Sequence, residues 1–181
     1  MRVKHRTAAP AAIVTLASAT LAGACGGGSG DDGSAPRTPR EALLQAACRG
    51  GGERTLELAV AEYVKQATPK PQRFLTAPGT DSALPDPGVR VLQDKGPLYY
   101  YPADPAQQAA VRAQLRDKGD YTTLLVVPRG SNVGERAGTI RLGGHFVGGE
   151  EDGRSAGDRS YAFTCDSAGW RLTRAAVEKS A

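Results

Sequence analysis

Few of the residue patterns that mark the common catalytic sites occur in this sequence. Its G-x-S-x-G match, Gly153-Arg154-Ser155-Ala156-Gly157, is not followed by a helix signal, so it lacks the strand-to-helix context of the nucleophile elbow of a serine hydrolase. It has no H-E-x-x-H motif for a zinc protease and no G-K-[ST] sequence to complete a phosphate-binding loop. Cys48 and Cys165 each lack a second cysteine or a histidine at metal-ligand spacing. We therefore expect no metal, no cofactor and no catalytic residue that a motif could identify.

Long hydrophobic runs are also scarce. The uncharged stretch over residues 8–24 is Ala-rich and weakly apolar, whereas a membrane-spanning helix needs roughly 20 predominantly apolar residues. Arg2, Lys4 and Arg6 precede this stretch, and small residues end it. This order is typical of a secretory signal peptide over residues 1–24. A single-pass membrane anchor is the alternative interpretation.

The predicted signal peptide ends at a cysteine. The segment Leu21-Ala22-Gly23-Ala24-Cys25 resembles the lipobox of bacterial lipoproteins. The resemblance implies that Cys25 is lipidated, becomes the new N-terminus and holds the protein at the outer face of the cytoplasmic membrane. A diacylglycerol on that cysteine would supply the two chains that stable anchoring requires. Residues 26–37, GGGSGDDGSAPR, have no large apolar side chain and predict a disordered linker after the lipidated cysteine, so that residues 25–37 form a tether.

The charge balance argues against a nucleic-acid partner. The whole chain has 23 basic and 19 acidic residues, but three of the basic ones precede Cys25, which leaves 20 against 19 and a net charge of +1. A nucleic-acid-binding protein needs a basic patch on the folded domain itself. The expected partners are the membrane, through the lipid, and an unidentified protein or small-molecule ligand. The richness in arginine, alanine and glycine resembles that of high-GC actinobacterial genomes.

Two cysteines remain once Cys25 is assigned to the lipid. An exported protein meets an oxidising compartment, where Cys48 and Cys165 most simply form a disulfide. Two free buried thiols are the alternative.

Residues 38–181 have the length of one ordinary globular domain. Thr38-Pro39-Arg40-Glu41 is a capping box that predicts a first helix, ended by the glycines at 50–52. A second amphipathic helix is expected over 54–67, and a third after the N-cap Asp104, to about residue 118. The proline-rich segment 68–89 predicts a loop.

About five strands are expected, and hairpin connections favour an antiparallel sheet. Their predicted positions are 98–101, 121–127, 138–147, 160–165 and 170–175. The fold class is therefore α+β, with a curved antiparallel sheet whose one face is covered by the two N-terminal helices and the later helix. This element order resembles the cone-shaped nuclear transport factor 2 superfamily and the related cystatin-like folds. Alternation along 160–165 predicts that Cys165 points into the core with Tyr161 and Phe163.

The candidate ligand contacts are aromatic and basic. Tyr99 and Tyr101 alternate with Tyr100 on a predicted strand, where tyrosine suits either packing or a binding surface. Arg141 and His145 share the polar face of another strand.

The Gly-rich segment 141–154 contains three consecutive acidic residues that do not have the spaced pattern of a calcium loop. It predicts a strand with glycine bulges that ends in an exposed acidic hairpin.

Two functions follow from these features. The first is a lipid-anchored, non-enzymatic binding or interaction module of the cell envelope. The alternative is a small enzyme of the cone fold that uses Asp120 or His145 as a pocket acid or base. The enzyme requires a carboxylate within hydrogen-bond reach of His145.

Overall fold

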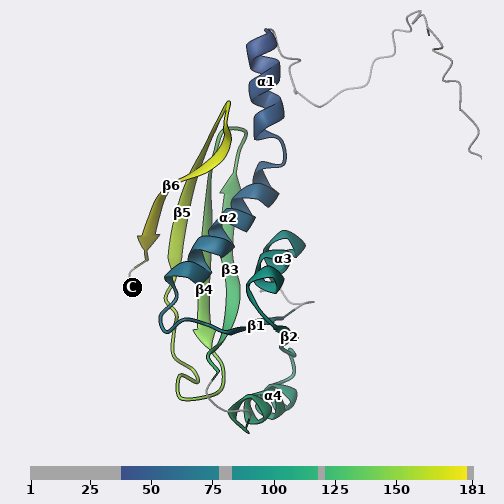
Figure 1. Ribbon diagram of the computed structural model, residues 1–181, viewed down its shortest axis with the longest axis vertical. Helices are drawn as coiled ribbons and strands as arrows, with labels where there is room; N and C mark the ends of the chain where they lie inside the picture. Colours follow the sequence, from purple (N-terminus) through teal and green to yellow (C-terminus); the bar gives the residue numbers. More distant parts are fainter. Residues whose placement is uncertain (1–37, 78–82, 118–120, 179–181) are drawn as a thin grey trace, which may run out of the picture. The chain divides into compact units, whose positions relative to one another are not determined.

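The computed structural model of this protein describes residues 38–77, 83–117 and 121–178. The predicted signal peptide and linker, together with Cys25 and Asp120, lie outside the described residues. Figure 1 shows the described part as helices around a single sheet, so the α+β class is confirmed. The helices are α1 (Pro39–Cys48), α2 (Gly51–Gln66), α3 (Asp86–Lys95) and α4 (Pro105–Asp117). The strands are β1 (Arg73–Thr76), β2 (Leu98–Tyr100), β3 (Thr123–Val133), β4 (Ala137–Phe146), β5 (Arg159–Asp166) and β6 (Gly169–Val177).

The sheet is mixed, which corrects the expectation of about five antiparallel strands. Its six strands are ordered β2-β1-β3-β4-β5-β6. β1 pairs in parallel with both β2 and β3, whereas β3, β4, β5 and β6 pair antiparallel in sequence order. The hairpin rule therefore holds for the C-terminal half. It fails at β1 and β2, because helical connections carry the chain back to start each next strand in the same direction.

The segment predicted as a proline-rich loop contains both a strand and the start of a helix. β1 is only four residues long, and Phe74 and Leu75 in it are buried. α3 begins at Pro85-Asp86-Pro87, where proline occupies the first helical turn and needs no hydrogen-bonded N–H. Pro85 and Pro87, which by composition predict a loop, thus lie at the N-terminus of a helix.

The first two helices follow the sequence signals closely. Thr38 accepts a hydrogen bond from the Glu41 backbone at 3.1 Å, and the Glu41 carboxylate accepts one from the Thr38 backbone at 3.0 Å, which confirms the capping box. The expected apolar stripe of the second helix is buried; it consists of Leu56, Val60, Tyr63, Val64 and Ala67. One detail was wrong, because Arg49 and Gly50 separate the two helices, and the next two glycines begin α2.

The sheet has a hydrophobic cluster on each face. The larger one lies under α2, where β3 and β4 contribute Leu124, Val126 and Leu142. The alternate residues of β3, Leu125 and Val127, belong to a second cluster with Leu115 of α4. Since neighbouring strand residues point to opposite faces, α4 packs on the face opposite α2. The expectation that all helices cover one face is therefore wrong.

A disulfide joins the helical layer to the C-terminal hairpin. The Sγ atoms of Cys48 and Cys165 are 2.10 Å apart, and both residues are buried. Trp170 pairs with Cys165 across β5 and β6, and its indole N–H donates to the Cys48 carbonyl at 2.9 Å. Tyr161, Phe163 and Cys165 all lie in the core, as the alternation predicted.

Adjacent glycines at the start of α2 provide a test of this junction. A Cβ on Gly51 would lie 2.5 Å from the Trp170 ring, whereas a Cβ on Gly52 would meet nothing within 4 Å. We expect Gly51→Ala to lower the free energy of unfolding by about 1–3 kcal/mol through overpacking. Gly52→Ala is expected to raise it by up to about 1 kcal/mol through helix propensity. Urea unfolding followed by circular dichroism measures both, and equal midpoints for the two variants would contradict the described packing.

Candidate functional site

The tyrosines predicted to contact a ligand differ in their exposure to solvent at the end of β2. Tyr99 and Tyr100 are 44% and 56% exposed, whereas Tyr101 is only 4% exposed. The backbone N–H of Tyr101 extends the pairing with β1 by donating a hydrogen bond to the Thr76 carbonyl at 2.7 Å. The Tyr101 side chain belongs to the hydrophobic cluster that α4 covers. Its hydroxyl accepts a hydrogen bond from Nε of Arg112 at 3.1 Å. Tyr101 is thus a structural residue, and Tyr99 is an exposed residue on a sheet edge.

Arg112 connects Tyr101 to the acidic turn after β4. Its Nη1 lies 3.1 Å from Oδ1 of Asp152, and the same carboxylate oxygen accepts the Gly148 N–H at 2.8 Å. The hydrogen bond to Tyr101 is the largest cause of the raised pKa of Arg112, and Asp152 adds to it. Of the neighbouring acids, Glu151 pairs instead with Arg154 at 2.7 Å. The acidic residues therefore diverge, and among the described residues no three acidic, cysteine or histidine side chains are arranged to hold a metal ion.

Gly143 and Gly144 let side chains approach both faces of β4. Both pair regularly with β3, so the predicted bulge at this point is wrong. A Cβ on Gly143 would overlap the ion pair between Arg129 and Asp158, whose charged atoms are 3.4 Å apart. A Cβ on Gly144 would lie 3.0 Å from the hydroxyl of Tyr63 on the other face. The two glycines serve close packing on both faces of β4.

The hydroxyl of Tyr63 is hydrogen-bonded on the face of β4 that α2 covers. Its hydroxyl donates to the Gly157 carbonyl at 2.7 Å, and burial raises its pKa to about 12. It therefore remains a neutral donor at physiological pH.

His145 lies on the face of β4 opposite α2, where it is half-buried between two arginine-aspartate pairs. Burial is the main cause of its lowered pKa, followed by the charges of Arg112 and Arg129, and Asp152 partly opposes them. Within the described part of the chain, no hydrogen bond or ion pair joins His145 to a carboxylate. Arg141 lies further along the strand, with its Nη2 3.5 Å from the Arg129 carbonyl. The predicted pair of Arg141 and His145 shares a face, but the Arg129 side chain and its partner Asp158 lie over the glycine between them.

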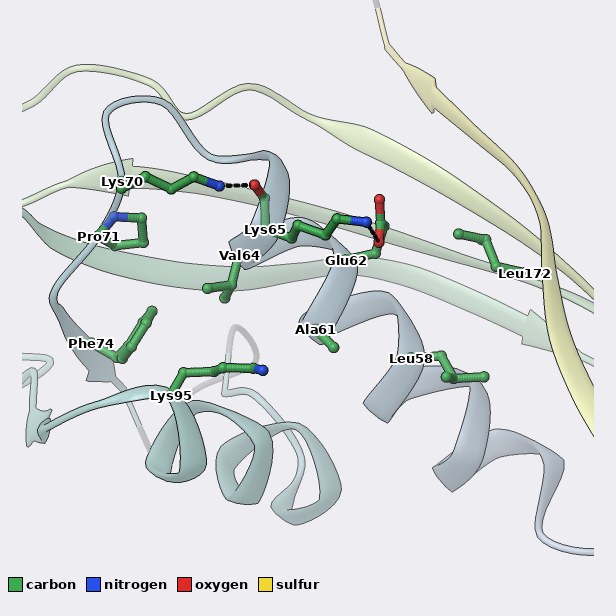
Figure 2. A pocket seen from close by; sticks show the side chains of 10 residues that line it. All are labelled: Leu58, Ala61, Glu62, Val64, Lys65, Lys70, Pro71, Phe74, Lys95 and Leu172. Carbon is green, nitrogen blue, oxygen red and sulfur yellow. Dashed lines mark hydrogen bonds and ion pairs between the residues drawn. The ribbon is translucent and has the colours of Figure 1, made fainter.

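A groove beside α2 is a second candidate site, and sequence reasoning missed it. It has a volume of about 470 Å³ and lies between α2, the start of β1 and the end of α3, reaching Leu172 of β6 (Figure 2). Its apolar lining consists of Leu58, Ala61, Val64, Pro71, Phe74 and Leu172, and its polar lining of Glu62, Lys65, Lys70 and Lys95. A volume of this size suits a small-molecule ligand. The signal that could have revealed it is the lysine distribution, because lysine is rare in this arginine-rich chain.

The lysines of the groove are placed by the ends of helices. Lys65 is in the last turn of α2, 3.4 Å from the Glu62 carboxylate, and Lys70 donates to the Lys65 carbonyl. Lys95 is in the last turn of α3, and Figure 2 shows it extended toward Ala61. Cations are favourable at the C-terminal end of a helix, which carries a partial negative charge. This explains why lysine amines are placed at the ends of these helices.

No protein family, curated protein or solved structure matches this chain. None of the helices within the described ranges is long and apolar enough to cross a membrane. Function is therefore inferred from the geometry of the chain itself.

The environment of His145 gives a pH dependence that can be measured. Because its pKa is lowered from 6.5, the folded state binds fewer protons than the unfolded state near that pH. The contribution to stability is complete above pH 6.5 and is lost as the pH falls through the lowered pKa. When the pH is lowered from about 7.5 to about 5.5, we expect the Tm of His145→Gln to fall by less than the Tm of the wild type. Arg141→Gln is the control on the same strand face and should keep the wild-type slope; equal slopes for all three proteins would contradict this account.

Proposed function

We propose that this protein is a lipid-anchored binding module of a bacterial cell envelope, attached through Cys25 at the outer face of the cytoplasmic membrane and without enzymatic activity. The observation that carries the binding role is the groove beside α2. It combines an apolar floor with amines at its rim, a composition that favours a ligand with one apolar and one anionic part.

The lining of the groove supports binding over catalysis. None of its lining residues is a histidine, a cysteine or a hydroxyl side chain, and its one carboxylate, Glu62, is paired with Lys65. A nucleophile or general base needs a partner group in hydrogen-bond reach to activate it. The groove therefore provides recognition without a reactive pair.

The outer face of the sheet gives no support to the enzyme alternative. Asp152 and Asp158, the acids beside His145, are each held by an arginine. A cone-fold enzyme that uses His145 would need one of them free to orient the imidazole. Asp120, the other proposed acid, lies outside the described residues.

Two features support export and anchoring. The disulfide between Cys48 and Cys165 fits an oxidising compartment. Residues 26–37 separate the lipobox cysteine from the first helix, and a fully extended chain of this length spans at most about 45 Å. A lipid on Cys25 would keep the domain close to the membrane surface without a transmembrane helix.

Anchoring is tested by removing the acceptor sulfur. We expect the wild type, produced in a bacterium that processes lipoproteins, to sediment with membranes and to carry a lipid mass on its N-terminal peptide. Cys25→Ala should appear in the soluble fraction without that mass, because the sulfur is the attachment atom. Ser29→Ala is the control within the linker and should behave as the wild type. Membrane retention of Cys25→Ala at the wild-type level would contradict the anchor.

Ligand binding is tested by filling the groove. Native mass spectrometry of the mature chain, isolated from membranes in mild detergent, is expected to show a bound small molecule. Ala61→Trp should lose it, because Ala61 lines the groove. Glu53→Trp, on the exposed first turn of α2, adds the same ring elsewhere and should retain the molecule. An adduct unaffected by Ala61→Trp, or no adduct in the wild type, would contradict the binding role of the groove.

A further inference from the structure

Every lysine in the described residues lines the groove beside α2. The whole chain has 17 arginines and six lysines, and the three lysines within the described ranges are Lys65, Lys70 and Lys95. They come from α2, from the connection to β1 and from α3. Arginines supply the paired cations elsewhere, including both ion pairs beside His145. The groove is thus chemically distinct from the rest of the described surface in the cation it uses.

The choice of amine over guanidinium bears on the ligand. A guanidinium is a planar fork that matches phosphate or carboxylate with two parallel hydrogen bonds, and it pairs readily with fixed partners. An ammonium group is a compact charge on a flexible apolar stem, and the stem can cover apolar surface while the charge stays in water. Lysines at the rim therefore fit a ligand whose apolar part lies on the floor and whose small charged end stays near the solvent.

The local charge is consistent with a single negative charge on the ligand. Three lysines and Glu62 give the lining a formal charge of +2. The C-terminal ends of α2 and α3 lie at the same site, and each carries about half a negative charge. The net local charge is then about +1. A carboxylate matches this value better than a doubly charged phosphate monoester.

The lysines also differ in whether an ion pair or a hydrogen bond within the protein already engages their amines. Lys65 is paired with Glu62, and Lys70 donates to the end of α2. Among the described residues, Lys95 makes no ion pair, and its side chain extends beside the apolar floor formed by Phe74 and Ala61 (Figure 2). Lys95 is therefore the residue placed to meet the ligand's charge.

We propose that the groove binds a single-chain carboxylate of the fatty-acid type, with its hydrocarbon chain on the apolar floor and its carboxylate at Lys95. The proposal rests on the binding function assigned above and adds the class of ligand. It commits to a ligand monomer in the groove, and attachment of the domain to an intact bilayer surface is a different outcome that the test separates.

The experiment is a calorimetric titration of the purified mature chain without its lipid, with each amphiphile kept below its micelle-forming concentration. The probes are decanoate, decyltrimethylammonium, decyl phosphate and acetate. Decanoate is expected to bind most tightly, and acetate should show no measurable binding because it lacks the chain. Affinity should rise about twofold to fourfold per methylene from hexanoate to decanoate, as partial to full burial of each group predicts.

Two variants assign the contacts. Lys95→Gln should weaken decanoate binding about threefold to tenfold while leaving decyltrimethylammonium unchanged or tighter. Arg90→Gln removes a positive charge from the same helix at an exposed position outside the groove, and it should leave the decanoate affinity unchanged. Ala61→Trp should abolish binding; if it unfolds, Ala61→Leu replaces it, and thermal unfolding of each variant verifies the fold.

The result that overturns the proposal is equal binding of decanoate and decyltrimethylammonium, or an equal effect of Lys95→Gln and Arg90→Gln. Tighter binding of decyl phosphate than of decanoate would overturn the choice of carboxylate. Cosedimentation with anionic vesicles in the absence of decanoate binding would assign the lysines to a bilayer surface instead. These failures leave the groove's general binding role intact, because a native adduct lost in Ala61→Trp tests that role independently.

Discussion

The junction of Cys48, Cys165 and Trp170 is the interaction on which the arrangement of the helical layer depends. The disulfide covalently links the end of α1 to β5, and the Trp170 indole donates a hydrogen bond to the Cys48 carbonyl. The same indole ring covers Gly51, so the first residue of α2 is fixed against β6. α2 then runs over the larger hydrophobic cluster, and its far end forms one wall of the groove. A constraint at one end of α2 thus sets the position of the groove at the other end.

Local sequence signals predicted the elements whose stability is local. The capping box at Thr38 and the N-cap at Asp104 depend on contacts within a few residues, and the apolar stripe of α2 is visible as a periodicity within that helix alone. The parallel strands were missed for the opposite reason. β1 has only four residues and owes its place to pairing with β2 and β3, which are distant in sequence and follow it in the chain. The placement of α4 on the second face likewise depends on a cluster assembled from separate strands, which no periodicity within α4 reveals.

The candidate site shows a similar division between local and non-local information. Alternation placed Arg141 and His145 on one face of β4, and the structure agrees. The sequence could not show that Asp152 and Asp158 would each be neutralised by an arginine from another element. Those pairings turn a possible acid-base cluster into a structural charge network. The groove was invisible for the same reason, since Lys65, Lys70 and Lys95 meet only when α2, β1 and α3 pack together.

Anchoring and ligand binding support each other in the proposed function. A domain tethered by residues 26–37 stays within about 45 Å of its lipid anchor, so it samples a small volume next to the membrane. Within that volume the effective concentration of membrane-derived single-chain amphiphiles exceeds their concentration in bulk water, because they partition into the bilayer. A groove of only modest affinity is then sufficient for occupancy, which suits a lining in which Lys95 alone among the described lysines has neither an ion pair nor a hydrogen bond. The same groove on a free domain would need a tighter site to achieve equal occupancy, so the proposed anchor would contribute to binding as well as to location.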